Sequence, residues 1–69
     1  MKIGSIVRLI DPYDGDMKYR NAIGIVLKIY DSDISPGEEI CHIRFQQHGD
    51  PLIHRIKEIY KCRLSIVKE

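Results

Sequence analysis

The sequence contains no tryptophan, one phenylalanine and two cysteines among its 69 residues, and it has no long hydrophobic run. No apolar stretch approaches the roughly 18 residues that a membrane-spanning helix needs. No signal-peptide pattern opens the chain. A chain of this length has room for one domain, residues 1–69, and none for a catalytic domain beside a regulatory one. We therefore expect a single small domain that does not act at a membrane.

A large excess of charge of either sign is also missing. Eleven Lys and Arg residues face ten Asp and Glu residues, which gives a formal net charge of +1. This balance excludes a basic nucleic-acid-binding tail and an acidic tail. The acidic residues gather around residues 11–16 and 31–39, whereas most basic residues fall on expected strands and in the later part of the chain. We therefore expect the near-zero sum to hide an acidic side and a basic side.

Isoleucine is the residue that the sequence has in excess, with 13 copies. Its β-branched side chain fits a pleated sheet better than a helix. Alternation and β-branched runs predict five strands, which cover residues 3–10, 22–30, 39–45, 51–55 and 62–67. Residues 56–60 are predicted to form one helical turn before the last strand. Gly24 lies inside the second run, where it predicts a bend or a close approach of another backbone.

Five short strands suit a small closed barrel, because closure removes the exposed edges that a small β protein must otherwise protect. The alternatives are an OB-type barrel and a small open antiparallel sheet. In the barrel, four aliphatic residues are expected to line the wall: Ile25, Leu27, Ile43 and Ile53. A hairpin centred on His48 would place His42 opposite His54 and Ile43 opposite Ile53, although a slip of one residue would destroy these pairs.

Four segments carry a resemblance to a known superfamily: GSIVRLI (4–10), AIGIVLKIY (22–30), ICHIRF (40–45) and IKEIYKCRLSIV (56–67). Together they resemble the SH3-like small barrels, especially the short stand-alone barrels of tailed phages, including phages of cyanobacteria. Leu64 and Val67 supply the ending that closes such a barrel. The resemblance implies an all-β, five-stranded SH3-like small barrel with one short helical turn before the last strand. It also implies a phage accessory protein in the host bacterial cytoplasm, although a fold alone assigns no activity.

Two departures from relatives of this fold narrow the expected activity. Proline-peptide-binding domains of the fold use a Trp-lined aromatic groove, and this sequence has only tyrosines for that purpose, so PxxP recognition is not expected. Nucleic-acid modules of the KOW type share the G-x-V strand of Gly24–Val26, but they usually carry more positive charge.

The two polar segments, residues 11–21 and 31–38, form the candidate docking surface. Long loops in a small domain often carry function, and in an SH3-like barrel these two lie near each other. Their carboxylates and tyrosines would then form an acidic rim for a basic partner. The predicted contact residues are Tyr13, Asp14, Asp16, Tyr19, Tyr30, Asp31 and Asp33.

A basic face is the alternative surface. It would bind nucleic-acid phosphates through the cations of the strands, with Tyr30 stacking on a base. The predicted residues are Lys28, Arg44, Arg55 and Arg63.

Catalytic, metal and cofactor chemistry finds little support in the sequence. The serines have no recognisable base beside them, and no phosphate-binding glycine loop is present. The spacing of Asp11, Asp14 and Asp16 does not match a calcium loop, and the histidines offer too few ligands for a metal. Cys41 and Cys62 lie 21 residues apart, which does not match a CxxC pair, and without a secretory signal we expect two buried free thiols in a reducing compartment.

These observations predict a non-enzymatic binding module, without cofactor or metal, that mediates protein–protein interaction with an unknown protein partner. The first alternative is a KOW- or Tudor-like barrel that binds nucleic acid. The second is a structural, homo-oligomeric component of a particle.

Overall fold

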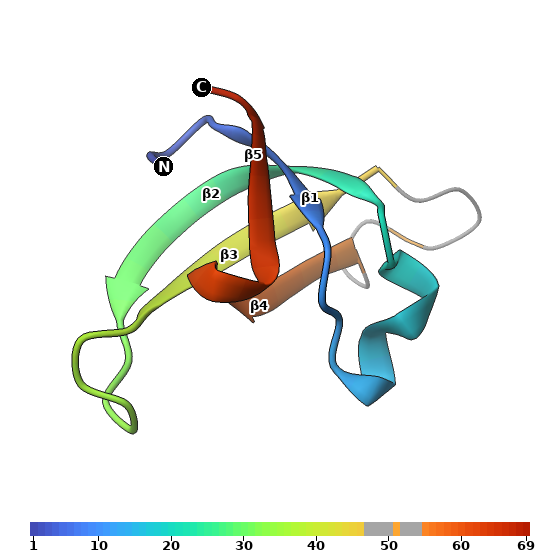
Figure 1. Cartoon of the computed structure of the whole chain (residues 1–69). Helices are drawn as coiled ribbons and strands as arrows, with labels where there is room; N and C mark the ends of the chain where they lie inside the picture. Colours follow the sequence, from blue (N-terminus) through green and yellow to red (C-terminus); the bar gives the residue numbers. More distant parts are fainter. Residues whose placement is uncertain (47–50, 52–54) are drawn as a thin grey trace.

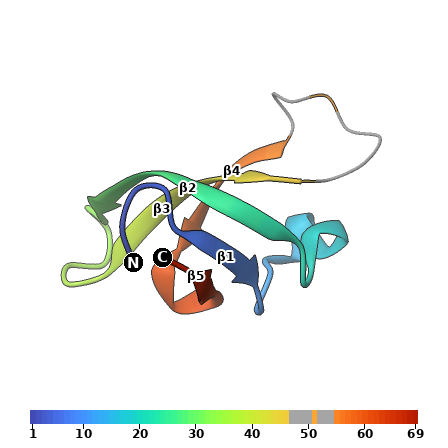
Figure 2. The same ribbon diagram turned by 90° about the horizontal axis from the view of Figure 1, so that it is seen from above.

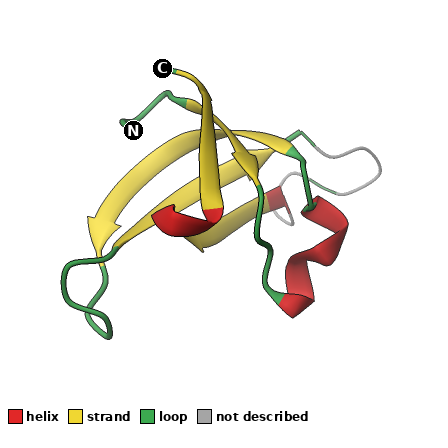
Figure 3. Ribbon diagram, in the orientation of Figure 1, coloured by secondary structure: helices red, strands yellow, loops and turns green. Residues whose placement is uncertain are grey.

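The computed structural model describes residues 1–46, 51 and 55–69. Within them the chain is all-β and forms one antiparallel sheet in the order β4-β3-β2-β1-β5 (Figure 1). The strands are β1 (Ile6–Leu9), β2 (Ile23–Asp31), β3 (Glu39–Phe45), β4 (Ile56–Tyr60) and β5 (Leu64–Lys68). The connections contain the 3₁₀ helices η1 (Asp14–Tyr19) and η3 (Lys61–Arg63) (Figure 3). The prediction of five strands with a short helical turn before the last one is confirmed.

The sheet does not close in the described residues, so the pairing shows the open-sheet alternative. Backbone pairs join β1 to β2 and β5, and β3 to β2 and β4, while β4 and β5 are the two edges. The short helix η3 connects these edges, and its last residue accepts two backbone hydrogen bonds: Ile10 N and Asp11 N donate to Arg63 O at 3.0 and 3.3 Å.

The predicted helical turn at residues 56–60 is wrong, because this segment is strand β4. Lys57 and Ile59 face the core side of the sheet. Because Lys57 is charged, the segment lacks the alternation of apolar and polar residues by which a strand is predicted. The helical turn comes next, at Lys61–Arg63, where the fifth strand was expected to begin. Of the strand predicted over residues 51–55, residues 52–54 lie outside the described part, and Pro51 and Arg55 are not in a strand.

The predicted register of a hairpin centred on His48 is also wrong, because His42 lies opposite Glu58 and Ile43 lies opposite Lys57. The expected partners His54 and Ile53 lie outside the described residues. Strand β4 begins later than expected, and the connection from β3 is correspondingly longer. Register depends on the length of the connection as much as on the pattern of the strands, and the connection between β3 and β4 was predicted to be too short.

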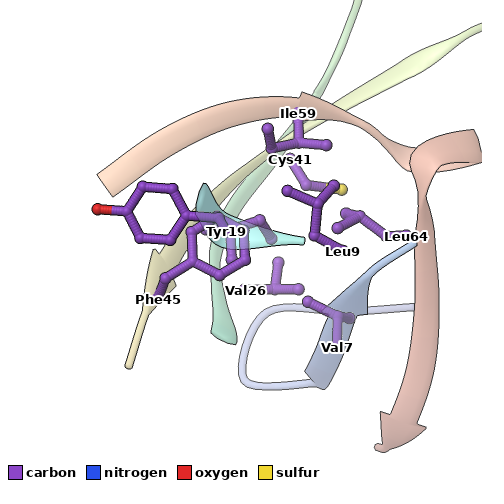
Figure 4. Packing of buried hydrophobic residues seen from close by; sticks show 9 residues of the cluster. Val7, Leu9, Tyr19, Val26, Cys41, Phe45, Ile59 and Leu64 are labelled. Atoms are coloured by element: carbon purple, nitrogen blue, oxygen red, sulfur yellow. The ribbon is translucent and has the colours of Figure 1, made fainter. Parts of the chain in front are cut away.

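The core lies on one face of the sheet, where all five strands and η1 contribute side chains (Figure 4). Its buried apolar members are Val7, Leu9, Tyr19, Val26, Cys41, Ile43, Phe45, Ile59 and Leu64. Gly24 belongs to this face, because a Cβ added there would overlap Ile43 Cγ2 and approach Phe45 Cδ1 to 3.0 Å. The same Cβ would lie 3.1 Å from the backbone oxygen of Arg44, so the expected close approach of a backbone at Gly24 is confirmed.

Strand β2 contains a bulge that corrects the predicted wall. Val26 pairs with Ile43 and Lys28 pairs with His42, so Leu27 is an extra residue without a partner on β3. Leu27 is consequently 39% exposed, and Ile25 is only half-buried on the outer face. The bulge changes which residues point inward, from Val26 before it to Ile29 after it.

Candidate functional site

The first half of the predicted docking surface, residues 11–21, is a structural element. Tyr19 is fully buried, and its ring stacks on Phe45 with 5.0 Å between the ring centroids. Lys18 and Lys57 place their ammonium groups 5.5 and 5.7 Å from the centre of the same ring. Tyr19 therefore cannot be the contact aromatic that was predicted, because its ring completes the core.

Tyr13 is held against the opposite end of the chain. Its hydroxyl accepts a hydrogen bond from Tyr60 N at 3.1 Å, and its ring packs edge-on against the Tyr60 ring at 6.5 Å. The Arg63 guanidinium lies 4.2 Å from the centre of the Tyr13 ring. Tyr13 is half-buried in these contacts. Its side chain therefore connects η1 to η3, and little of it is left to contact a partner.

The acidic residues of this segment pair with basic residues from late in the chain. Asp16 Oδ1 lies 3.6 Å from Lys57 Nζ, and Asp11 Oδ2 lies 3.3 Å from Arg63 Nη1. Arg63 Nη1 also donates a hydrogen bond to Asp11 O at 2.9 Å. The expected polarisation into an acidic and a basic side is thus partly cancelled by contacts between the two groups, and Asp14 stays exposed.

The second half of the predicted surface lies elsewhere. Both views show η1 and the loop that joins β2 to β3 at opposite ends of the sheet (Figures 1 and 2). The predicted rim across both loops therefore does not form. We name residues 32–38, with Asp31 and Glu39 at the strand ends, the β2–β3 loop.

Internal hydrogen bonds fix the base of the β2–β3 loop. Ser32 is buried, its Oγ accepts from Ile34 N at 3.3 Å and Ser35 N at 3.1 Å, and its own N donates to Glu38 O at 2.9 Å. Glu38 N donates to Ser35 O at 3.1 Å, and Gly37 has a φ of 90°, so residues 35–38 form a type II turn with Pro36-Gly37 at its two central positions. The tip is left to solvent: Ile34 is 88% exposed, and Asp31 and Asp33 are exposed beside it.

A hollow of about 370 Å³ lies at the base of this loop, against η3. It is lined by Gly37, Glu38, Glu39, Tyr60, Lys61 and Cys62. Lys61 Nζ pairs with Glu39 Oε1 at 3.2 Å across it, and Tyr60 Oη lies 3.4 Å from Ser32 Oγ. The contribution of residues 60–62 was missed, because no sequence pattern shows that η3 folds back against a loop more than twenty positions earlier.

The two thiols differ, although both were expected to be buried. Cys41 is buried in the core, where desolvation, helped by the charge of Glu39, raises the pKa of its thiol. Cys62 is exposed at the hollow, so the prediction for this residue is wrong. The error has a simple cause: η3, and not a strand, carries Cys62, and no neighbouring strand covers it. Both thiols are free, as expected.

A polar cluster joins three strands on the outer face of the sheet. Tyr30 Oη donates to Glu58 Oε2 at 2.8 Å and lies 3.2 Å from His42 Nε2, while Glu58 Oε1 is 3.5 Å from the same nitrogen. Because the hydroxyl proton serves Glu58, His42 must donate from a protonated Nε2 for both bonds to form. The hydrogen bond to Glu58, followed by desolvation, raises the pKa of Tyr30. This tyrosine is therefore held in a network and is only half-buried.

The predicted nucleic-acid residues are divided between different surfaces. Lys28 and Arg44 share the outer face with His42, since cross-strand pairs join Lys28 to His42 and Arg44 to Ile25. Arg63 is engaged at Tyr13 and Asp11. Arg55 is half-buried, and its Nε has no hydrogen-bond partner in the described part of the chain.

The described residues hold no group of three or more His, Cys, Asp or Glu side chains placed to bind a metal ion. No helix among them has the length and apolarity required to cross a membrane. Comparison with protein-family models, curated proteins and solved structures finds no match to this chain.

Proposed function

We propose that this chain is a non-enzymatic binding module that docks another protein on the β2–β3 loop and the hollow at its base. One observation carries the proposal: Ile34 is 88% exposed at the tip of a loop whose base is fixed by hydrogen bonds. Exposing a large aliphatic side chain on a rigid support contributes nothing to the fold, whereas it suits a contact residue whose binding costs little ordering entropy.

The charge of the loop favours a basic partner. Asp31, Asp33 and Glu38 are exposed around the loop, while Glu39 already pairs with Lys61. A protein surface that offers cations around an apolar depression would match both the carboxylates and Ile34. Of the residues predicted from the sequence, Asp31 and Asp33 belong to the proposed site. Tyr30 precedes the loop on β2, and the residues of η1 are not part of the site. The resemblance to phage small barrels supports an accessory role in the host cytoplasm.

An NMR titration tests this site. The ¹⁵N-labelled chain is titrated with a peptide of alternating Arg and Leu, and with a peptide in which Glu replaces Arg. We expect shifts at residues 31–39 and 60–62 with the basic peptide alone, and their loss in the variant Ile34→Ser. The variant Asp14→Asn on η1 is the matched control and should bind normally. Shifts centred on η1, or none at millimolar peptide, would contradict the proposal.

The nucleic-acid alternative keeps only part of its support, because two of its four cations, Lys28 and Arg44, share a face. Titration with short single-stranded DNA at low salt tests it on the same sample. Binding through phosphate contacts would weaken steeply as salt is added.

A further inference from the structure

We propose that the protein docked by the β2–β3 loop is a second copy of this chain, which receives Ile34 in a hollow on the outer face of its sheet. The inference rests on the proposed function, since it names the partner of the same loop. It joins two surfaces of the molecule that are otherwise unexplained and that complement each other in shape and charge.

The receiving hollow has a volume of about 120 Å³. Its lining is mainly aliphatic, from Ile6, Ile23, Gly24, Ile25, Arg44 and Gln46. Pockets that hold small molecules usually measure about 300–1,000 Å³, so this one is suited to a single side chain. The three isoleucines are only half-buried, because their strand neighbours Val7 and Val26 point into the core and leave them on the outer face.

Positive charge surrounds this hollow. Arg44 lies opposite Ile25 and Arg8 lies opposite Ile23, both exposed, and Lys28 follows on the same face with its ammonium 5.6 Å from the Tyr30 ring. No carboxylate of the described residues forms an ion pair with any of these three cations. Glu58, on the same face, is already engaged by Tyr30 and His42. The hollow therefore favours an apolar side chain flanked by carboxylates.

The β2–β3 loop presents that combination. Ile34 follows Asp33 directly and Asp31 by three positions, and all three are exposed. The type II turn and the bonds to Ser32 already hold the loop in shape, so docking would order few additional groups.

A single chain cannot make this contact with itself. The hollow lies where β2 begins, at residues 23–25, whereas the loop follows the far end of the same strand, after Asp31. Figure 1 shows these two ends of β2 on opposite sides of the molecule. The contact must therefore be made between copies, either reciprocally in a two-fold dimer or head-to-tail in open chains or rings.

Sedimentation velocity tests the contact on the full chain from micromolar to millimolar concentration. We expect a mass that grows with concentration and falls with added salt, because exposed charges are screened. Ile34→Ser removes the inserted side chain and Arg44→Glu reverses the charge at the hollow. Each variant alone should self-associate at least tenfold more weakly. The controls Ile3→Ser and Arg20→Glu change exposed residues away from both surfaces and should behave as the original chain.

Mixing the two variants makes the test specific. The Arg44→Glu copy keeps an intact loop and the Ile34→Ser copy keeps an intact hollow, so the mixture should form one-to-one dimers and nothing larger. A chain that stays monomeric at millimolar concentration and low salt would overturn the inference. Self-association unchanged in either variant, or no dimer in the mixture, would overturn it as well. If the chain is monomeric but still binds the Arg-Leu peptide on its loop, the proposed function stands and only the second copy is rejected.

Discussion

The connection between β1 and β2 is held along its length, whereas the β2–β3 loop is held only at its base. In the first, Tyr19 enters the core, Tyr13 packs on Tyr60, and Asp11 and Asp16 pair with Arg63 and Lys57. In the second, the hydrogen bonds centre on Ser32 and leave Ile34 and its neighbouring carboxylates in solvent.

The difference shows that acidic composition does not reveal what a loop does. Both segments carry several carboxylates and both were expected to dock a partner. What separates them is the aromatic content: tyrosines in a connection of a small domain supply apolar area that the core needs. A loop that leaves a large apolar side chain in solvent is the better candidate for a partner. The following changes test this contrast, from the largest expected effect to the smallest.

Replacing Tyr19 by Ala should have the largest effect. Removing a buried aromatic ring typically lowers the free energy of unfolding by about 3–5 kcal/mol, and small domains hold only about 5–15 kcal/mol in all. Urea unfolding followed by circular dichroism measures the loss. Ile34→Ser is the matched comparison in the other loop and should stay within about 0.5 kcal/mol of the original chain. Similar losses in both variants would contradict the contrast.

Replacing Tyr13 by Phe isolates one hydrogen bond. The ring keeps its contacts with Tyr60 and Arg63, but Tyr60 N loses its acceptor. A buried donor left without a partner costs about 1–3 kcal/mol. The same urea experiment reports it, and an unchanged midpoint would show that water replaces the hydroxyl.

Neutralising one carboxylate in each loop should have a smaller effect. Asp16→Asn removes the pair with Lys57, in which the side chains are 16% and 31% exposed, and should cost at most about 1 kcal/mol. Asp33→Asn should cost nothing measurable. The loss at Asp16 should shrink at high salt, and a salt-independent loss would point to hydrogen bonding instead.

Tyr30, the third tyrosine of the predicted site, should have an effect that depends on pH. Its pKa in the folded chain is raised above the ordinary value of 10.0, chiefly by the hydrogen bond to Glu58. Its contribution to stability is therefore full below pH 10 and is lost as the pH rises through the raised pKa. The difference in unfolding free energy between the original chain and Tyr30→Phe should be constant at neutral pH and should vanish at high pH. A difference that grows with pH would contradict the network.

Local patterns predicted four of the five strands well, but they misplaced β4 and predicted the contacts between strands poorly. The alternation of Cys41, Ile43 and Phe45 with His42 and Arg44 placed β3 and its buried face correctly, because burial on one face of a strand leaves a period of two. Strand β4 does not follow this alternation, because the charged residue Lys57 lies on the core side of the strand. The partner of His42 depended on the length of a connection, which no local pattern measures.

The candidate site was predicted in part for the same reason. Asp31 and Asp33 lie on the exposed loop, as expected, while Tyr19 and Tyr13 are used by the fold. Ile34 was overlooked, since an isoleucine in a polar segment is not conspicuous until its exposure is known. The hollow on the outer face is lined by side chains from three strands. It therefore depends on how the strands are paired, and it could not be predicted from the sequence.

The bulge in β2 has a consequence for how the chain tolerates changes in its length. Leu27 is the residue that has no partner, and the pairs on either side of it face opposite directions. Deleting Leu27 would leave every existing pair of β2 in place and would remove only the extra curvature that a bulge gives its strand. Deleting Ile25 would instead move Ile23 and Gly24 by one position and turn them to the wrong faces. Among related sequences of unequal length, a one-residue gap in this strand should therefore align with Leu27.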